Sequence, residues 1–317
     1  MATETLVQGG EYQQQNRLGI DDLLKDYKPG SIRQAGLLTF EGVGDNDVYN
    51  VTAPFRVGSQ RYIAGRVEPR DNEFASKTVF FTEQGGVWQP DHNTPALELQ
   101  DPFVCFINGE LILGGVKAWP TGNGSAAWYT EFWRGPNLRE LSPWISGPLG
   151  MKGIRLVESG DSVAVFTRPQ GEVGGLGTIG FTVIDTLDEL NGAVIEKAKL
   201  LDGLFAPGEW GGVNQAKQLA DGTIGVLGHV ARFEPDNSRS YYAMSFRFDP
   251  LQFAVSEYRM VAARHDFPPA APKREDLANV FYPGGWESTD TVDILYGGAG
   301  DSCAPFGYCN RLFPAQR

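Results

Sequence analysis

The chain of 317 residues has few of the residues that build metal centres and disulfide frameworks. Its scarce cysteines and histidines are Cys105, Cys303, Cys309, His92, His229 and His265. The cysteines are odd in number and form no C-x-x-C pair, so we expect neither a disulfide framework nor a zinc cluster, and a reducing compartment is favoured. No H-x-x-x-H pair and no Gly-rich P-loop occurs, which argues against a catalytic zinc and against a nucleotide-binding loop of that type.

The chain also lacks long apolar runs and an excess of positive charge. No stretch approaches the ~20 apolar residues that span a bilayer. The opening residues, MATETLVQGG, lack the charged-then-apolar pattern of a signal peptide. We therefore expect a cytoplasmic protein without a membrane partner. Lys and Arg number 27 against 39 Asp and Glu, which argues against a nucleic-acid partner but leaves room for a small basic pocket around one phosphate.

Glycine and proline are abundant instead, with 40 and 20 residues. They show no collagen period and indicate many turns between short strands. Strand-like runs and tight turns such as FINGEL, VESGDSV and QLADGTI recur in five modules, near residues 36–90, 97–148, 150–200, 210–262 and 276–313. A repeat of roughly 45–55 residues is typical of four-stranded propeller blades.

This pattern predicts an all-β fold, a five-bladed β-propeller over residues 36–317, with a two-sheet sandwich as the competing architecture. Residues 1–35 are interpreted as an N-terminal arm, helical at most within IDDLLKDY.

Polar residues recur at similar places in successive modules. Taken singly, each has an ordinary explanation as an ion pair, a turn residue, a surface charge or a core histidine. In a propeller, however, the inner strands converge on one central funnel, so the joint recurrence favours a shared site. Its members would be Arg66, Glu68, Asp101, Lys152, Arg168, His229 and Asp301.

The segments that carry these residues resemble glycoside hydrolase family 130, the five-bladed β-mannoside phosphorylases, in the same order over nearly the whole chain. AGRVE (64–68) is similar to that family's Arg-Val-Glu strand, and QDPFV (100–104) to its Glu-Asp-Pro-Arg motif, with Asp101 on the catalytic acid. KGIRLV and FTRP resemble its Lys and Arg segments. GTIGVLGHVA (222–231) resembles its Tyr-His-Gly strand, and ILYGGAGDS (294–302) its Tyr-Gly-Ala-Ala-Asp.

Three departures point to a sister group. Phe103 stands where that family has Arg, Gly228 replaces the Tyr before His229, and WGGVNQ (210–215) replaces a Gly- and Pro-rich loop. These variants resemble the mannosyltransferase/phosphorylases of glycosyltransferase family 108, which is known from trypanosomatid parasites and makes and degrades β-1,2-linked mannan. The resemblance implies an enzyme of mannosyl transfer, and polymerising, phosphorolytic and hydrolytic roles stay open.

The resemblance also implies a role for each residue. Asp101 would be the general acid, with a pKa raised enough to keep a proton near neutrality, and the proton would reach the glycosidic oxygen through a sugar hydroxyl. The phosphate would be held by Lys152, Arg168 and His229. The residues expected to bind mannose are Arg66, Glu68 and Asp301, with Asp47, Asn50 and Tyr242 as further candidates.

We expect no metal and no cofactor, because the basic cluster would neutralise the phosphate of mannose 1-phosphate or the diphosphate of GDP-mannose. The D-x-D-like pair Asp45 and Asp47 is interpreted as loop or sugar-binding residues rather than as metal ligands. The expected reaction transfers mannose, with inversion, between these donors and β-1,2-mannooligosaccharides.

Two alternatives are an inverting β-mannoside hydrolase, with Glu68 or Asp301 as its second carboxylate, and a non-catalytic glycan-binding propeller. Linkage specificity, donor preference, direction and oligomeric state do not follow from the sequence.

Overall fold

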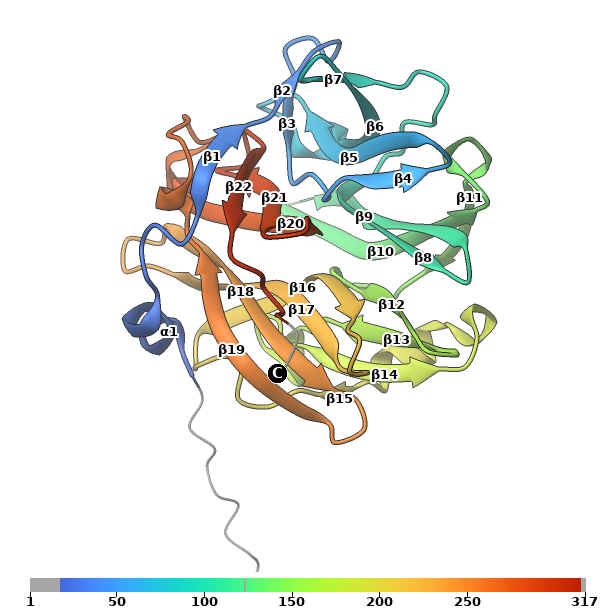
Figure 1. The fold of residues 1–317 in the computed structure, drawn as a ribbon, viewed down its shortest axis with the longest axis vertical. Helices are drawn as coiled ribbons and strands as arrows, with labels where there is room; N and C mark the ends of the chain where they lie inside the picture. The colour runs from blue at the N-terminus through green and yellow to red at the C-terminus, as the bar shows by residue number, and fades with distance from the viewer. Residues whose placement is uncertain (1–17, 123, 315–317) are drawn as a thin grey trace, which may run out of the picture.

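The computed structural model describes residues 18–122 and 124–314, and these residues form mainly curled antiparallel sheets grouped around a common centre (Figure 1). The predicted all-β class is therefore confirmed, and the arrangement is propeller-like. None of the described helices is long and apolar enough to cross a membrane. The helices are α1 (Ile20–Asp26), α2 (Gly171–Gly174) and α3 (Gly192–Glu196), with single 3₁₀ turns at Glu73–Ala75, Leu138–Glu140, Leu187–Glu189, Arg264–Asp266 and Glu275–Leu277.

Three of the sheets follow the first three predicted modules along the chain. The first sheet contains β2 (Thr39–Phe40), β3 (Asp47–Tyr49), β4 (Phe55–Val57), β5 (Gln60–Glu68), β6 (Lys77–Gln84) and β7 (Val87–Pro90). The second contains β8 (Gln100–Ile107), β9 (Glu110–Gly122), β10 (Ser125–Gly135) and β11 (Ser142–Ser146). The third contains β12 (Arg155–Ser159), β13 (Ser162–Thr167), β14 (Gly180–Ile184) and β15 (Lys199–Leu200).

An eight-stranded sheet holds the remaining strands as two antiparallel sets. One set is β16 (Glu209–Gln218), β17 (Ile224–Phe233), β18 (Arg239–Asp249) and β19 (Ala254–Ala262). The other is β20 (Asn279–Ser288), β21 (Asp293–Ala299), β22 (Pro305–Cys309) and β1 (Arg33–Leu37). A short parallel pairing of β18 with β20, in which Ser240 lies opposite Asn279, joins the two sets into one sheet.

Tight turns join the strands where the sequence predicted them. Between β8 and β9, Asn108 and Gly109 both have positive φ, 51° and 78°. Two successive residues with positive φ make the hairpin turn whose twist matches that of the flanking strands, and Asn-Gly is the preferred pair for it. This local chemistry explains why the hairpin could be recognised in the sequence.

Strand β1 corrects the predicted module boundaries. It begins at Arg33, inside the predicted arm, and pairs with β22 of the last set, with Arg33 opposite Tyr308. Gly36 is required in this pairing, because a Cβ there would lie 2.7 Å from the ring of Phe306. The pairing connects the two ends of the chain, which local sequence patterns cannot reveal. Residues 1–17 of the predicted arm lie outside the described residues.

Apolar clusters lie between neighbouring strand groups. We count the three smaller sheets as the first to third groups, the set β16–β19 as the fourth, and the set of β20, β21, β22 and β1 as the fifth. One cluster joins Leu99 and Leu113 of the second group to Phe80 of the first. Similar clusters lie between the second and third groups, the third and fourth, and the fourth and fifth. A further cluster joins the first group to the last, where Phe81 and Trp88 pack with Tyr296. The packing is therefore continuous around the centre and holds the inner strands beside one another.

Candidate active site

The innermost strands of the groups run in the same sense, and cavities lie at both of their ends. On β8, Asp101 lines one cavity and Cys105 lines the other. On β20, Tyr282 lines the first and Glu287 the second. We call the cavity at the strand starts the basic cavity and the one at the strand ends the far cavity. The basic cavity has a volume of about 190 Å³. The predicted site residues that line it are Asn50, Arg66, Asp101, Lys152, Arg168, His229 and Asp301.

Three residues of the basic cavity share an unusual backbone conformation. Asn50, Asp101 and Asp301 have φ of 47°, 49° and 53°, in the left-handed region that Asn and Asp tolerate better than other non-glycine residues. Asp101 lies in an irregular stretch of β8, where the pairing with β9 shifts register between Gln100 and Phe103. Such conformations cost energy and cluster at functional sites. Their meeting at one cavity is therefore an independent mark of a site.

Asp101 receives two hydrogen bonds on the same oxygen. Asn50 Nδ2 donates to Oδ1 over 2.8 Å, and Arg66 Nη1 donates to it over 3.2 Å. Burial by itself would raise the pKa of Asp101, but Arg66, the Asn50 hydrogen bond and Lys152 together lower it below its usual value. The expectation of a raised pKa is thus wrong for the protein alone, because the neighbouring cations favour the carboxylate.

Glu68 lies behind Arg66 and does not line the cavity, which corrects its predicted contact with mannose. It is 1% exposed, and Arg66 reaches it over 2.8 Å. Tyr49, Ser76 and Lys273 also donate to its carboxylate. Glu68 therefore fixes the guanidinium of Arg66, which in turn contacts Asp101.

Three cations of the cavity have no carboxylate partner within the described part of the chain. Arg155 and Arg168 are 4% and 5% exposed, and no carboxylate lies within 4.0 Å of either or of Lys152. The Nε atoms of Arg168 and Arg155 donate to backbone carbonyls, those of Gly211 and Asn214, over 2.7 and 2.8 Å.

Burial lowers the pKa of all three cations. Buried charge without a counter-charge is costly, so this arrangement is suited to an anion. Gly212 leaves space for the Arg168 side chain, since a Cβ there would lie 2.6 Å from Arg168 Cδ.

His229 is held as a neutral imidazole. Its Nδ1 lies 2.8 Å from Asn214 Oδ1, and its ring stacks on Tyr241 at 5.6 Å. Burial and the three nearby cations hold its pKa well below the usual 6.5. Asn214 Oδ1 accepts the hydrogen bond from Nδ1–H, so Nε2 of the neutral ring can accept a hydrogen bond from a ligand hydroxyl but supplies neither a donor nor a positive charge at neutral pH.

Asp301 is a second buried carboxyl group of the cavity, beside Asp101. No hydrogen bond to its side chain is formed by residues 18–122 or 124–314. Burial raises its pKa even though Arg66 is near, and the charge of Asp101 adds to the shift. The pKa values of Asp101 and Asp301 are thus shifted in opposite directions. In many active sites such opposite shifts distinguish the group that carries a proton from the group that stays ionised.

Two predicted sugar-binding residues lie elsewhere. Tyr242 is 6% exposed and belongs to the core cluster between the third and fourth groups, whereas its neighbour Tyr241 lines the cavity. Successive strand residues point to opposite faces, so the prediction was wrong by one position. Asp47 does not line the cavity either, because its carboxylate is engaged by Arg70 over 2.8 and 3.0 Å.

Several residues that line the cavity were not predicted from the sequence: Arg155, Arg239, Tyr241, Arg274 and Tyr282. Arg155 stood in the KGIRLV segment beside Lys152 and could have been chosen by the same resemblance. Tyr282 carried no such signal. Among the described residues, no cluster of three or more His, Cys, Asp or Glu side chains is placed to hold a metal ion.

Comparison with known proteins adds family evidence to this geometry. A family model described as a protein of unknown function (DUF1861) matches residues 25–306, and no curated protein matches the chain. A solved structure of MPT-4, a mannose phosphorylase from Leishmania mexicana in complex with phosphate ion, is 33% identical, with a TM-score of 0.83 over 89% of both chains. MPT-1, a GDP-Man-dependent mannosyltransferase from the same organism, is 30% identical, with a TM-score of 0.85 over 94% of this chain and 96% of that one.

A more distant structure shares the fold alone. The β-1,2-mannobiose phosphorylase from Listeria innocua is 12% identical, with a TM-score of 0.61 over 90% of this chain and 93% of that one. The resemblance seen in the sequence is confirmed by the two Leishmania structures. The chain belongs to the DUF1861 family and to the same family as the mannose phosphorylase MPT-4 and the mannosyltransferase MPT-1.

Proposed function

We propose that this protein transfers mannose, with inversion, between a phosphorylated donor and a β-1,2-mannooligosaccharide. The donor is mannose 1-phosphate or GDP-mannose, and the reverse of transfer from mannose 1-phosphate is phosphorolysis. The observation that carries the proposal is a group of three cations beside the carboxylate of Asp101, the buried Arg155 and Arg168 and the half-buried Lys152, for which no described residue supplies a carboxylate partner. The named activities of MPT-4 and MPT-1 support the same pair of donors.

We further propose that the five antiparallel groups act as five blades of one propeller, with their inner strands lining a central channel. The continuous apolar packing from the first group to the last supports this arrangement. It is also the arrangement that brings Asn50, Asp101, Arg155 and Tyr282 to one place.

In the phosphorolytic direction, the cations hold inorganic phosphate beside the anomeric carbon of the terminal mannose. A phosphate oxygen attacks that carbon as the bond to the glycosidic oxygen breaks. Asp101 supplies a proton to the departing oxygen through a sugar hydroxyl, so the products are mannose 1-phosphate and a chain shortened by one residue. In the synthetic direction Asp101 accepts the proton from the acceptor hydroxyl.

The charges around Asp101 set its proton affinity. Arg66 and Lys152 lower its pKa in the protein alone. Inorganic phosphate or the phosphate of mannose 1-phosphate, bound at Lys152, offsets that cation and raises the pKa of Asp101. The bound anion thus prepares Asp101 to carry the transferred proton in both directions.

Hydrolysis is less well supported, because an inverting hydrolase needs a second carboxylate as base. Glu68 is engaged by Arg66, Tyr49, Ser76 and Lys273. Burial raises the pKa of Asp301, and of the two candidates it is the carboxyl group left for that role. Phosphate needs no such base, because it is itself the nucleophile.

The test is to incubate the protein with β-1,2-mannobiose, with and without phosphate, in EDTA, and to follow phosphorus NMR and free mannose. We expect α-mannose 1-phosphate only with phosphate, and elongation of mannooligosaccharides from mannose 1-phosphate or GDP-mannose. Mannose release without phosphate would instead identify a hydrolase. Absence of product from every donor would leave a glycan-binding protein.

A further inference from the structure

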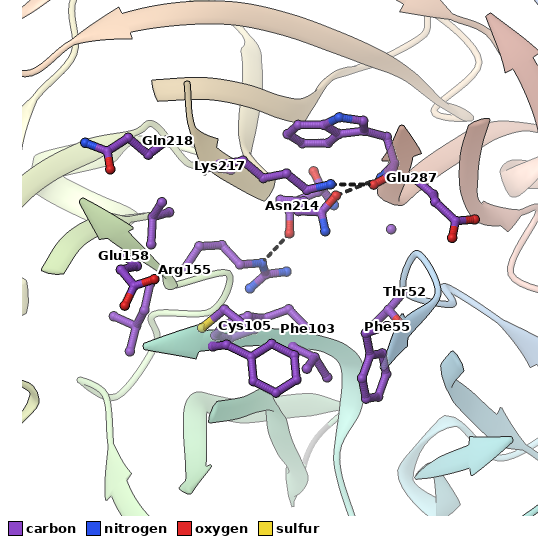
Figure 2. Close-up of a pocket in the computed structure, with 18 of the residues that line it drawn as sticks. Thr52, Phe55, Phe103, Cys105, Arg155, Glu158, Asn214, Lys217, Gln218 and Glu287 are labelled. Atoms are coloured by element: carbon purple, nitrogen blue, oxygen red, sulfur yellow. Dashed lines mark hydrogen bonds between the residues drawn. The ribbon is translucent and has the colours of Figure 1, made fainter. Parts of the chain in front are cut away.

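The far cavity is the larger of the two described above, with a volume of about 680 Å³. It lies at the ends of β8, β12, β16 and β20, and the segment Thr52–Phe55 closes its remaining side (Figure 2). Its size falls in the range of pockets that bind small ligands. Nothing in the proposed reaction uses it.

Arg155 separates the far cavity from the basic cavity, because it lines both. Its Nε donates to Asn214 O over 2.8 Å and its Nη1 to Ile154 O over 3.0 Å. The guanidinium also lies over the ring of Phe103 at 4.5 Å. These contacts fix the Arg155 side chain in place between the two cavities.

The charges of the two cavities differ. The charged side chains of the far cavity are Arg155, Lys217, Glu158 and Glu287, two of each sign. Those of the basic cavity are Arg66, Lys152, Arg155, Arg168, Arg239, Arg274, Glu73, Asp101 and Asp301, with twice as many cations as anions. A balanced cavity gives no preference to phosphate and is suited to a neutral ligand.

The far cavity offers donors, acceptors and an aromatic ring together. Lys217 Nζ donates to Trp286 O over 2.9 Å and has no carboxylate within 4.0 Å among the described residues; burial lowers its pKa to about 8. Glu158 Oε1 accepts a hydrogen bond from the backbone N–H of Asn108 over 2.7 Å, and no described residue donates to Oε2. The ring of Phe106 is 38% exposed.

Sugar hydroxyls both donate and accept hydrogen bonds, and the C–H face of a pyranose packs on an aromatic ring. Charged groups of both signs, exposed amides such as Gln218 and an exposed ring match that chemistry. A phosphorylated ligand would instead meet Glu158 as a like charge, whereas Glu287 is paired with Arg61 over 2.7 Å. The lining therefore favours a neutral chain of sugar residues.

We propose that the far cavity is an accessory binding site for a neutral oligosaccharide. The choice of mannose as the bound sugar rests on the proposed function, because a mannooligosaccharide is then the substrate of the basic cavity. A second hold on the same polymer keeps the enzyme near its substrate between reactions, which raises the effective concentration of chain ends.

The experiment measures binding of β-1,2-mannotetraose by calorimetry in phosphate-free buffer. The full chain carries Asp101→Asn, so that no turnover occurs. We expect two tetraose molecules bound per chain. Adding Phe106→Ala and Glu158→Gln should weaken one of the two sites at least 10-fold and leave the other. Glu158→Gln keeps an acceptor for the Asn108 amide, which protects the fold.

Phe74→Ala is the matched control, because Phe74 is 39% exposed and lies outside the far cavity; both sites should persist in it. A single tetraose per chain would overturn the proposal, as would two sites that Phe106→Ala and Glu158→Gln leave unchanged. Equal binding of maltotetraose would overturn the choice of mannose.

The two proposals fail separately. Two tetraose sites together with no product from any donor would refute the proposed reaction and support this inference. Normal phosphorolysis with one tetraose site would refute only this inference.

Discussion

The two cavities are built from opposite ends of the same inner strands, yet they differ in size and charge. The basic cavity is less than a third as large as the far cavity. It nevertheless contains Asn50, Asp101 and Asp301 in the left-handed backbone conformation, together with cations that have no carboxylate partner in the part of the chain that the structure describes. The comparison teaches that the chemistry of a site follows from its unsatisfied charge and strained backbone rather than from its volume.

Both cavities share Arg155, but its two sides are unlike. Toward the basic cavity it joins Lys152 and Arg168, and toward the far cavity it meets Glu158 and Lys217. The division of labour that we propose, an anion on one side and a neutral sugar chain on the other, depends on this asymmetry. Three changes would break or sharpen it.

The largest effect is expected for Asp101→Asn. Loss of the acid and base should lower kcat by about 10²–10⁴-fold, whereas the fold and binding of mannose stay nearly intact, since the amide has almost the same shape. Steady-state kinetics and thermal unfolding measure the two. Asp161→Asn, an exposed position outside both cavities, is the control. Retained turnover in Asp101→Asn would remove the basic cavity from the chemistry.

A smaller effect is expected for Arg168→Ala. Loss of one charged contact to phosphate should raise the KM for phosphate by about 10–100-fold, equivalent to ~1.4–2.7 kcal/mol. The KM for the oligosaccharide should change much less. Exposed Arg56 supplies the control variant Arg56→Ala. Equal losses for phosphate and sugar would contradict an anion site at Arg168.

The smallest effect concerns acid stability. The pKa of His229 is held below its unfolded value of about 6.5, so at lower pH the unfolded chain binds a proton that the folded chain does not. The contribution of His229 to the free energy of unfolding is complete above pH ~6.5 and falls by up to ~1.4 kcal/mol per pH unit below it. Urea unfolding at pH 7.0 and 5.5 measures this loss.

His229→Gln should reduce that pH dependence, whereas His92→Gln, at an exposed position, should keep it. An unchanged pH dependence in His229→Gln would show that the basic cavity does not hold this imidazole neutral. The far cavity contains no histidine, so no corresponding effect is expected there.

The features that depend on local sequence were predictable. The pair Asn108-Gly109 predicts the hairpin between β8 and β9, and the regular recurrence of such turns predicts the strand groups. Asp101, Lys152 and Arg168 could be placed in one site because each is carried by a motif with a known order. The structure brings them to one cavity, and their roles stay predictions.

The features that depend on register and on distant partners were not predictable. Tyr241 and Tyr242 are adjacent, and only the strand register decides which one faces the cavity. Glu68 shares a strand with Arg66, but its withdrawal from the cavity depends on Lys273, far away in the chain. The lowered pKa of Asp101 likewise results from neighbours that only the folded structure assembles.

The pairing of β1 with β22 has a consequence for how the protein is made. β1 is synthesised long before its partner strand, because β2 to β21 lie between them in the chain. At about 5–20 residues per second, the edge of β1 stays unpaired for on the order of 10–60 s. During that time its hydrogen-bonding groups are open to other chains. Pairing of β1 is thus a late event in folding, and it covers this strand edge only after β22 has been made.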